Sequence, residues 1–165
     1  MVTLPQWYQG GYPDIEKLLR ALLQPLLSDV NVVSWIPKPD VYQAELDAGR
    51  GYLRTYRTGG AMNLIAQNRD EPRVQFAALC PSRDESWQLI EFIRQVLSCF
   101  IRETGVLLNL DGTPVKFAAE GEIAGPQLIP ELLQDDKLVP ITFQLFTWKP
   151  KGLPDYRAAL NLPDL

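Results

Sequence analysis

Histidine is absent from this chain of 165 residues, and the familiar catalytic and metal-binding patterns are absent with it. Without an imidazole, no Ser-His or Cys-His pair can activate a nucleophile, and the commonest metal ligand is missing. The sequence also lacks a GxxxxGK[ST] phosphate loop, a GxGxxG dinucleotide turn and a CxxC pair. These absences predict a protein that is not an enzyme and that uses no cofactor and no metal ion.

Cysteine is scarce as well, since the chain contains only Cys80 and Cys99. Two cysteines suit a reducing compartment, and we interpret both as small buried side chains rather than as a disulfide. Cys80 precedes a predicted helix, where a thiol pKa can fall, but no basic partner is visible nearby, so a reactive role is disfavoured. A catalytic or metal-binding role is likewise disfavoured for Lys116 and for the adjacent carboxylates Asp135 and Asp136.

Long apolar runs and an excess of positive charge are missing too. No segment approaches the roughly 18 consecutive apolar residues that cross a bilayer. The first residues, MVTLPQWYQGGYP, lack the basic and apolar regions of a secretory signal, so we expect no membrane partner. The net charge of −4 argues against a general attraction to nucleic acid.

One basic segment nevertheless leaves a nucleic-acid alternative open. In GRGYLRTYRT, the arginines at positions 50, 54 and 57 alternate with Tyr52 and Tyr56. Aromatic rings beside guanidinium groups are typical of single-strand binding. The same alternation is produced by any half-exposed strand, and a protein interface or a plain strand is favoured here.

Two helices and several strands stand out from the rest of the sequence. The stretch PDIEKLLRALLQPLL has an apolar face at helical spacing, and Pro25 predicts a kink or an end near Gln24. Ser82 with Glu85 predicts a capping box, so a second helix begins there directly after the strand-like run 73–80. Strands are predicted for VNVVSWI, GYLRTYRT, GVLLNL, VKFAAEGEIAG and KLVPITFQLFTWK, with Asp111-Gly112 as a hairpin turn.

The order of these elements predicts an α+β fold in which two main helices pack on a mostly antiparallel β-sheet. GGAMNLIAQNRDE is read as a long connection, and YQAELDAGRG as a loop or short helical piece. We divide the chain into an N-terminal arm over 1–12, a single domain over 13–149 and an extended C-terminal arm over 150–165.

Four segments, in order, resemble the tail terminator proteins of phages with long non-contractile tails, especially those of actinobacterial siphophages. The first is PDIEKLLRALL followed by VNVVSWIP, and the second is YLRTYRTGG. The third is DEPRVQFAALCPSRDESWQLIEFIRQVL, and the last is GPQLIPEL leading to VPITFQLFTW. The N-terminal arm, YQAELDAGRG and the C-terminal tail depart from the family pattern.

The resemblance implies a tail-terminator-like fold and a structural role in the virion, at the junction of tail and neck, after assembly in the host cytoplasm. Such a protein forms a homohexameric ring that caps the tail tube, ends its polymerisation and joins the tail to the head. Its partners would be its own copies, the major tail tube protein, the head-tail connector protein and the tape measure protein. Genomic DNA would pass through the lumen without specific binding. The alternative is a head-tail connector or stopper ring of the neck.

For such a ring we expect one set of residues at contacts with partner proteins and another set at the bore. The tail and the long connection hold apolar groups without the periodicity of a core, so we expect them to contact partners. A basic bore would hold DNA, so acidic loops are expected there. The interface candidates are Arg54, Arg57, Arg73, Met62, Leu64, Ile65, Tyr156 and Leu160, and the lumen candidates are Glu120, Glu122, Asp135 and Asp136.

Overall fold

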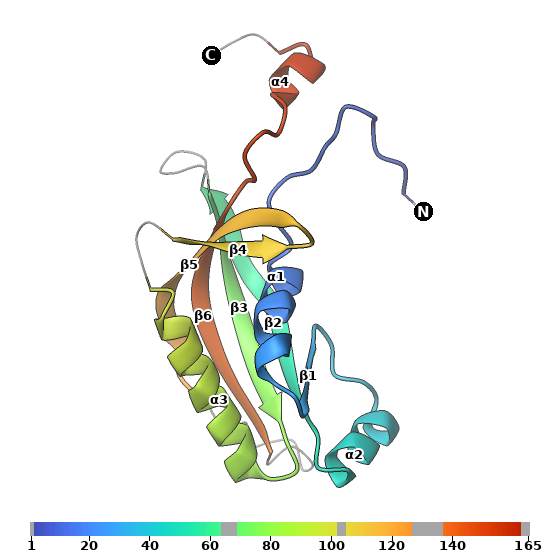
Figure 1. Cartoon of the computed structure of the whole chain (residues 1–165), viewed down its shortest axis with the longest axis vertical. Helices are drawn as coiled ribbons and strands as arrows, with labels where there is room; N and C mark the ends of the chain where they lie inside the picture. The colour runs from blue at the N-terminus through green and yellow to red at the C-terminus, as the bar shows by residue number, and fades with distance from the viewer. Residues whose placement is uncertain (1, 64–68, 102–104, 127–136, 163–165) are drawn as a thin grey trace.

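The structure is a computed structural model that describes residues 2–63, 69–101, 105–126 and 137–162. It confirms the α+β class, with four α-helices and a six-stranded sheet among the described residues (Figure 1). In chain order the elements are α1 (Ile15–Leu23), the 3₁₀ turn η1 (Gln24–Leu26), β1 (Val30–Val33), α2 (Pro39–Asp47), β2 (Gly51–Asn63), β3 (Arg69–Leu79), α3 (Arg83–Ser98), β4 (Val106–Leu110), β5 (Thr113–Ala124), β6 (Leu138–Trp148) and α4 (Tyr156–Ala159).

Local side chains fix the starts of the two helices that carry most of the core. The carboxylate of Asp14 accepts hydrogen bonds from the first backbone N–H groups of α1. At the start of α3, the Ser82 hydroxyl accepts from the N–H of Glu85 at 3.2 Å, and the Glu85 carboxylate accepts from the N–H of Ser82 at 2.8 Å. This reciprocal pair is the predicted capping box.

The sheet is mixed, so the expectation of a mostly antiparallel sheet was wrong. Its strand order is β1-β2-β3-β6-β5-β4, and β1 runs parallel to β2 while the other neighbours are antiparallel. Parallel neighbours need a crossover connection, which here contains α2 between Val33 and Gly51. The segment YQAELDAGRG therefore contributes a helix whose low apolar periodicity hid its role in the topology.

The predicted long connection over 59–71 is mostly strand. β2 continues through Asn63 and β3 begins at Arg69, with a bulge in the register between Arg57 and Gly59. Gly60 has φ +94°, and a Cβ there would lie 2.0 Å from the carbonyl oxygen of Glu71 on β3. The bulge thus lies at Thr58, and Gly59 and Gly60 after it pair with Arg73 and Pro72, so the ladder continues where glycine in a sequence suggests an interruption.

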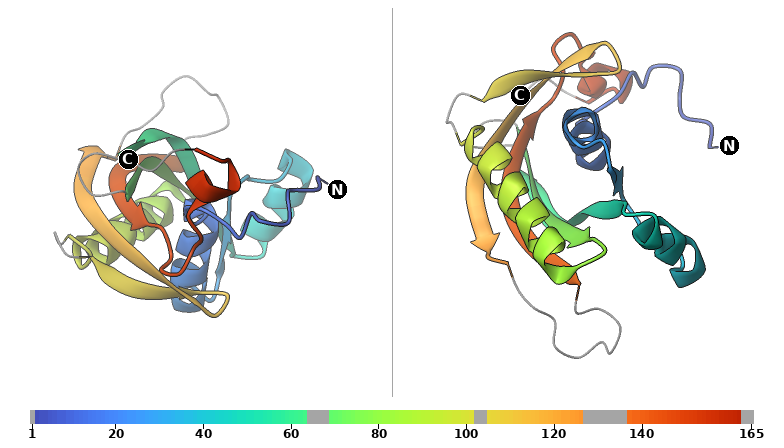
Figure 2. Two further views of the ribbon diagram at one scale, coloured as in Figure 1. Left: turned by 90° about the horizontal axis from the view of Figure 1, so that it is seen from above. Right: turned by 60° about the horizontal axis from the view of Figure 1, so that its bottom comes forward.

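The sheet curls around the helices on its inner face. Bulges in β5 at Ala119/Gly121 and Glu122/Ala124 add twist near one edge. As a result α1 contacts β1 and β2 at one end of the strand order and β4 at the other (Figure 2). The main core lies between this inner face and the helices, and its largest fully buried side chains are Phe76, Phe117, Ile15, Leu18, Leu19, Leu23, Leu53, Ile90, Ile93, Leu97, Ile141 and Leu145.

The outer face of the sheet has no second layer along most of its described length. Among the described helices only α2 packs on it, where Leu46 joins Tyr52 and Leu79 in a small separate cluster. Both arms leave the end of the domain opposite to α2, and the short helix α4 stands apart from the sheet (Figure 1). The fold therefore buries one sheet face and leaves helix flanks, sheet edges and arms at the surface.

The packing of α3 gives a stability prediction. Ile93 is fully buried, so Ile93→Ala should lower the free energy of unfolding by about 2–5 kcal/mol, because it removes buried methyl groups and leaves a cavity. Trp87 on the same helix is 43% exposed, so Trp87→Ala should lower it by less than about 1 kcal/mol. Chemical denaturation measures both, and equal midpoints for Ile93→Ala and the wild type would contradict this packing.

Candidate interaction surfaces

The described residues hold no constellation suited to metal or nucleophile chemistry. No group of three or more Cys, Asp or Glu residues in the described ranges could hold a metal ion. Cys80 is buried, and the loss of water around its thiol raises the pKa, which is opposite to what a reactive cysteine needs. Cys99 is exposed and free rather than buried as expected. No helix in the described part of the chain is long and apolar enough to span a membrane.

Arg57, predicted at an interface, is bound within its own chain. Its guanidinium donates two hydrogen bonds to the carboxylate of Asp70, at 2.6 and 2.9 Å, across the β2–β3 pair. It also donates to the carbonyl of Gly59 beside the bulge, and its backbone N–H donates to Glu16 of α1 at 2.9 Å. Asp70 is buried, so Arg57 neutralises a carboxylate beneath the surface and joins the bulge to α1.

The other two predicted arginines lie on the outer face of the sheet. Arg54 donates to Gln75 on the neighbouring strand, and Arg73 is exposed, with Gln144 at 3.4 Å. Further along this face, Arg69 lies over the Phe146 ring at 3.8 Å and Lys116 over the Trp148 ring at 4.4 Å. Long cationic side chains therefore cover these two aromatic rings of the outer face.

The acidic residues predicted to line the bore differ in their surroundings. Glu120 is exposed on β5, whereas Glu122 forms an ion pair with Arg94 of α3 at 2.8 Å. Asp135 and Asp136 lie outside the described residues, as do the interface candidates Leu64 and Ile65. Met62 is 49% exposed near the end of β2, and Leu160 is exposed after α4.

The two arms meet through Tyr156, at positions almost the whole chain apart. The Tyr156 hydroxyl donates to the carbonyl of Gly10 at 2.7 Å and accepts from the N–H of Gln9 at 3.2 Å. Its ring stacks on Tyr8 with centroids 5.6 Å apart and contacts Trp7 at 5.8 Å. We call residues 2–12 and 149–162 together the arm unit.

The arm unit presents apolar side chains to solvent. Asp155 caps α4 by accepting from the N–H of Arg157, and Leu153 packs beside Gly10. Despite these contacts, the unit keeps six large apolar residues exposed, which are Val2, Leu4, Trp7, Tyr8, Leu160 and Leu162. A concentration of exposed apolar groups of this kind marks an interaction site.

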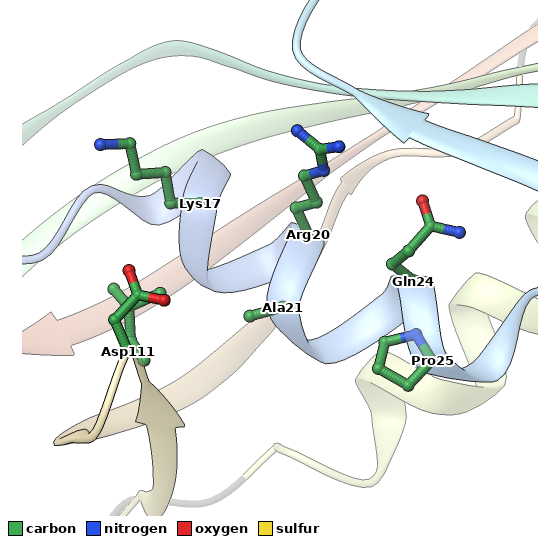
Figure 3. Close-up of a pocket in the computed structure, with 7 residues that line it drawn as sticks. Lys17, Arg20, Ala21, Gln24, Pro25 and Asp111 are labelled. Carbon is green, nitrogen blue, oxygen red and sulfur yellow. The ribbon is translucent and has the colours of Figure 1, made fainter.

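One groove, the hairpin groove, lies between α1 and the tip of the β4–β5 hairpin. Lys17 and Arg20 of α1 stand at its rim, and Asp111 approaches from the hairpin turn (Figure 3). Asp111 and Gly112 both have positive φ, 50° and 82°, which is the turn that the Asp-Gly pair predicted. The lining also includes Ala21, Pro25 and Leu110, so the hairpin groove combines apolar groups with two cations and one carboxylate.

A second groove, the α3 groove, lies between η1–β1 and the first turns of α3. Its volume is about 320 Å³, and Phe92, which is 38% exposed, lies along one side. Two carboxylates, Asp29 and Glu85, line it and no cation does. Its other lining residues are Leu27, Val30, Gly49, Gly51, Cys80, Pro81, Gln88 and Leu89.

The assignment of Tyr156 and Leu160 to an interface stays a prediction, and sequence reasoning missed the α3 groove. Phe92 and Trp87 belong to the broad apolar arc of α3, and both are partly exposed. The available signal was the width of the apolar arc on α3, which exceeds what one sheet face can cover. Trp35, which is 71% exposed and contacts Tyr56 edge to face, was also missed.

A comparison with protein families gives one finding that bears on these surfaces. The model of a family described as phage tail termination protein matches residues 11–154. The matched range contains both grooves and the whole sheet, whereas Trp7, Tyr8 and Tyr156 lie outside it. No curated protein matches the chain.

The Arg57–Asp70 pair predicts that Arg57, which is bound within the chain, contributes more to stability than the exposed Arg73. Arg57→Ala leaves a buried carboxylate without its partner and should lower the free energy of unfolding by about 2–3 kcal/mol. This is below the ~3–5 kcal/mol of fully buried pairs because 36% of the Arg57 side chain is exposed. Arg73→Ala on the next strand should change it by less than about 0.5 kcal/mol. Equal destabilisation by both substitutions in urea titrations would contradict the assignment of Arg57 to an internal role.

Proposed function

We infer that the function follows from one premise: the chain belongs to the phage tail termination protein family, and it is a structural component of the virion tail by that membership. From this premise we propose that it forms a ring on the last ring of the tail tube, ends tube polymerisation and joins the tail to the head-side connector. The match over residues 11–154 carries the proposal, because it includes nearly all of the folded domain.

The described surface supports a role in assembly rather than in chemistry. Both grooves and the arm unit are separate from one another, and each combines apolar groups with charges of one prevailing sign. A subunit of a ring that caps the tube needs at least two different surfaces for its neighbours in the ring, and further surfaces for the tube and the connector. We propose that the chain acts without catalysis, a cofactor or a metal ion.

The ring is proposed to be a homohexamer of the actinobacterial siphophage type. A closed ring uses heterologous contacts, in which one patch of each copy meets a different patch of the next. DNA passes through such a ring, so the net charge of −4 favours a bore that does not retain it. Glu120 stays a bore candidate, and Arg73 stays a candidate for contact with a neighbouring carboxylate.

Tail length in infected cells tests the proposed function. Without this chain, tube subunits should continue to add, so electron microscopy should show tubes longer than wild-type tails and heads without tails. Supplying the wild-type chain from a plasmid should restore a single tail length. Tails of normal length that merely lack heads would contradict termination and favour the stopper ring of the neck.

The C-terminal arm gives a separate prediction within the same assay. No described residue after Trp148 belongs to either apolar core cluster, so deleting residues 151–165 should leave the unfolding midpoint within a few degrees of wild type. Loss of the exposed leucines should reduce ring assembly or head joining, and infectious yield should fall at least tenfold. Normal yield of full-length, head-joined particles would show that the tail makes no contact of consequence.

A further inference from the structure

The arm unit and the α3 groove lie at opposite ends of the molecule. Both arms leave one end of the domain, whereas α3 begins at the other end, beside the loop that follows β3 (Figure 1). The groove is lined by the first turns of that helix, including Glu85 and Leu89. An arm in the position described therefore lies away from the groove of its own chain.

We propose that the arm unit of one copy docks into the α3 groove of a second copy of this chain. This inference rests on the proposed function, since a ring built from one protein needs a heterologous contact of this kind. It goes beyond the family match, because the aromatic residues that hold the two arms together lie outside residues 11–154.

Charge complementarity favours this pairing. The α3 groove contributes Asp29 and Glu85 with no lining cation, and the nearest arginine in the sequence, Arg50, is bound by Glu45 at 2.9 Å. The described part of the arm unit carries three cationic residues, Lys149, Lys151 and Arg157, and one carboxylate, Asp155, which caps α4. Opposite charges at the rim of an apolar contact favour the correct partner and orientation.

The net charges of the arms and of the rest of the chain also have opposite signs. Residues 1–12 contain no charged side chain, and residues 149–165 contain three of the 16 basic residues and two of the 20 acidic ones. The arms therefore carry a net charge of +1 and the rest of the chain −5. The hairpin groove is the weaker candidate for the arm unit, because Lys17 and Arg20 at its rim would repel these cations.

The contact at Tyr156 explains why two arms would dock as one. Its two hydrogen bonds and its stacking on Tyr8 hold the N-terminal arm against α4. An already ordered ligand loses less conformational entropy on binding than two free segments would. Phe92 and Leu89 then supply an apolar wall for the exposed leucines of the arm unit.

Two full-length variants, each broken in one surface only, test this contact. Phe92→Arg adds a cation and bulk to the groove while leaving the arms intact, and Tyr156→Ala separates the arms while leaving the groove intact. Trp87→Arg is the matched control, because Trp87 is exposed to a similar extent on the same helix but does not line the groove. Sedimentation at concentrations up to about 100 µM measures self-association, and circular dichroism checks that each variant is folded.

The wild type and Trp87→Arg should associate equally, and each of the other two variants should associate at least tenfold more weakly. An equimolar mixture of Phe92→Arg and Tyr156→Ala should form a 1:1 complex that grows no further, since one intact arm unit meets one intact groove. A wild type that stays monomeric, a Phe92→Arg variant that associates like its control, or a mixture without the complex would each overturn the proposal. Tail length in infected cells is measured separately. If both variants still give tails of wild-type length, this contact is refuted and the terminator assignment is unaffected.

Discussion

The packing of α1 and α3 against a single face of a curled sheet is the constraint on which the rest of the structure depends. These helices bury almost the whole apolar core, and the curl of the sheet brings β1, β2 and β4 around α1. Two helices cannot also cover the outer face, which α2 touches at one end only. Because the domain is stabilised from one side, its helix flanks and arms are left for other proteins to contact.

Polar residues complete that arrangement at the places where the backbone departs from regular pairing. Arg57 binds the buried carboxylate of Asp70 beside the bulge in β2. The backbone N–H of Arg57 also donates to the carboxylate of Glu16 on α1. Cationic side chains cover Phe146 and Trp148 on the outer face. The arms and α3 still hold eight exposed large apolar residues, which are Val2, Leu4, Trp7, Tyr8, Trp87, Phe92, Leu160 and Leu162, and exposed apolar groups of this kind mark interaction sites.

Features that depend on neighbouring residues could be predicted from the sequence, and features that join distant residues could not. The Ser82–Glu85 capping box and the Asp111-Gly112 turn are local, and both are present. The parallel pairing of β1 with β2 depends on a crossover through a weakly amphipathic helix. Gly59 and Gly60 indicated a break where the structure continues the pairing of β2 with β3. The contact of Tyr156 with Tyr8 and the α3 groove arise only once the chain has folded.

Position in the particle tests the central claim, that this chain caps one end of the tail tube, more directly than any property of the isolated protein. Cryo-electron microscopy of intact particles, followed by fitting of the curled sheet and α3, would locate every copy. We expect one ring, at the head-proximal end of the tube and between the tube and the connector. Density for this fold along the tube, at the distal tip or within the head alone would contradict the claim.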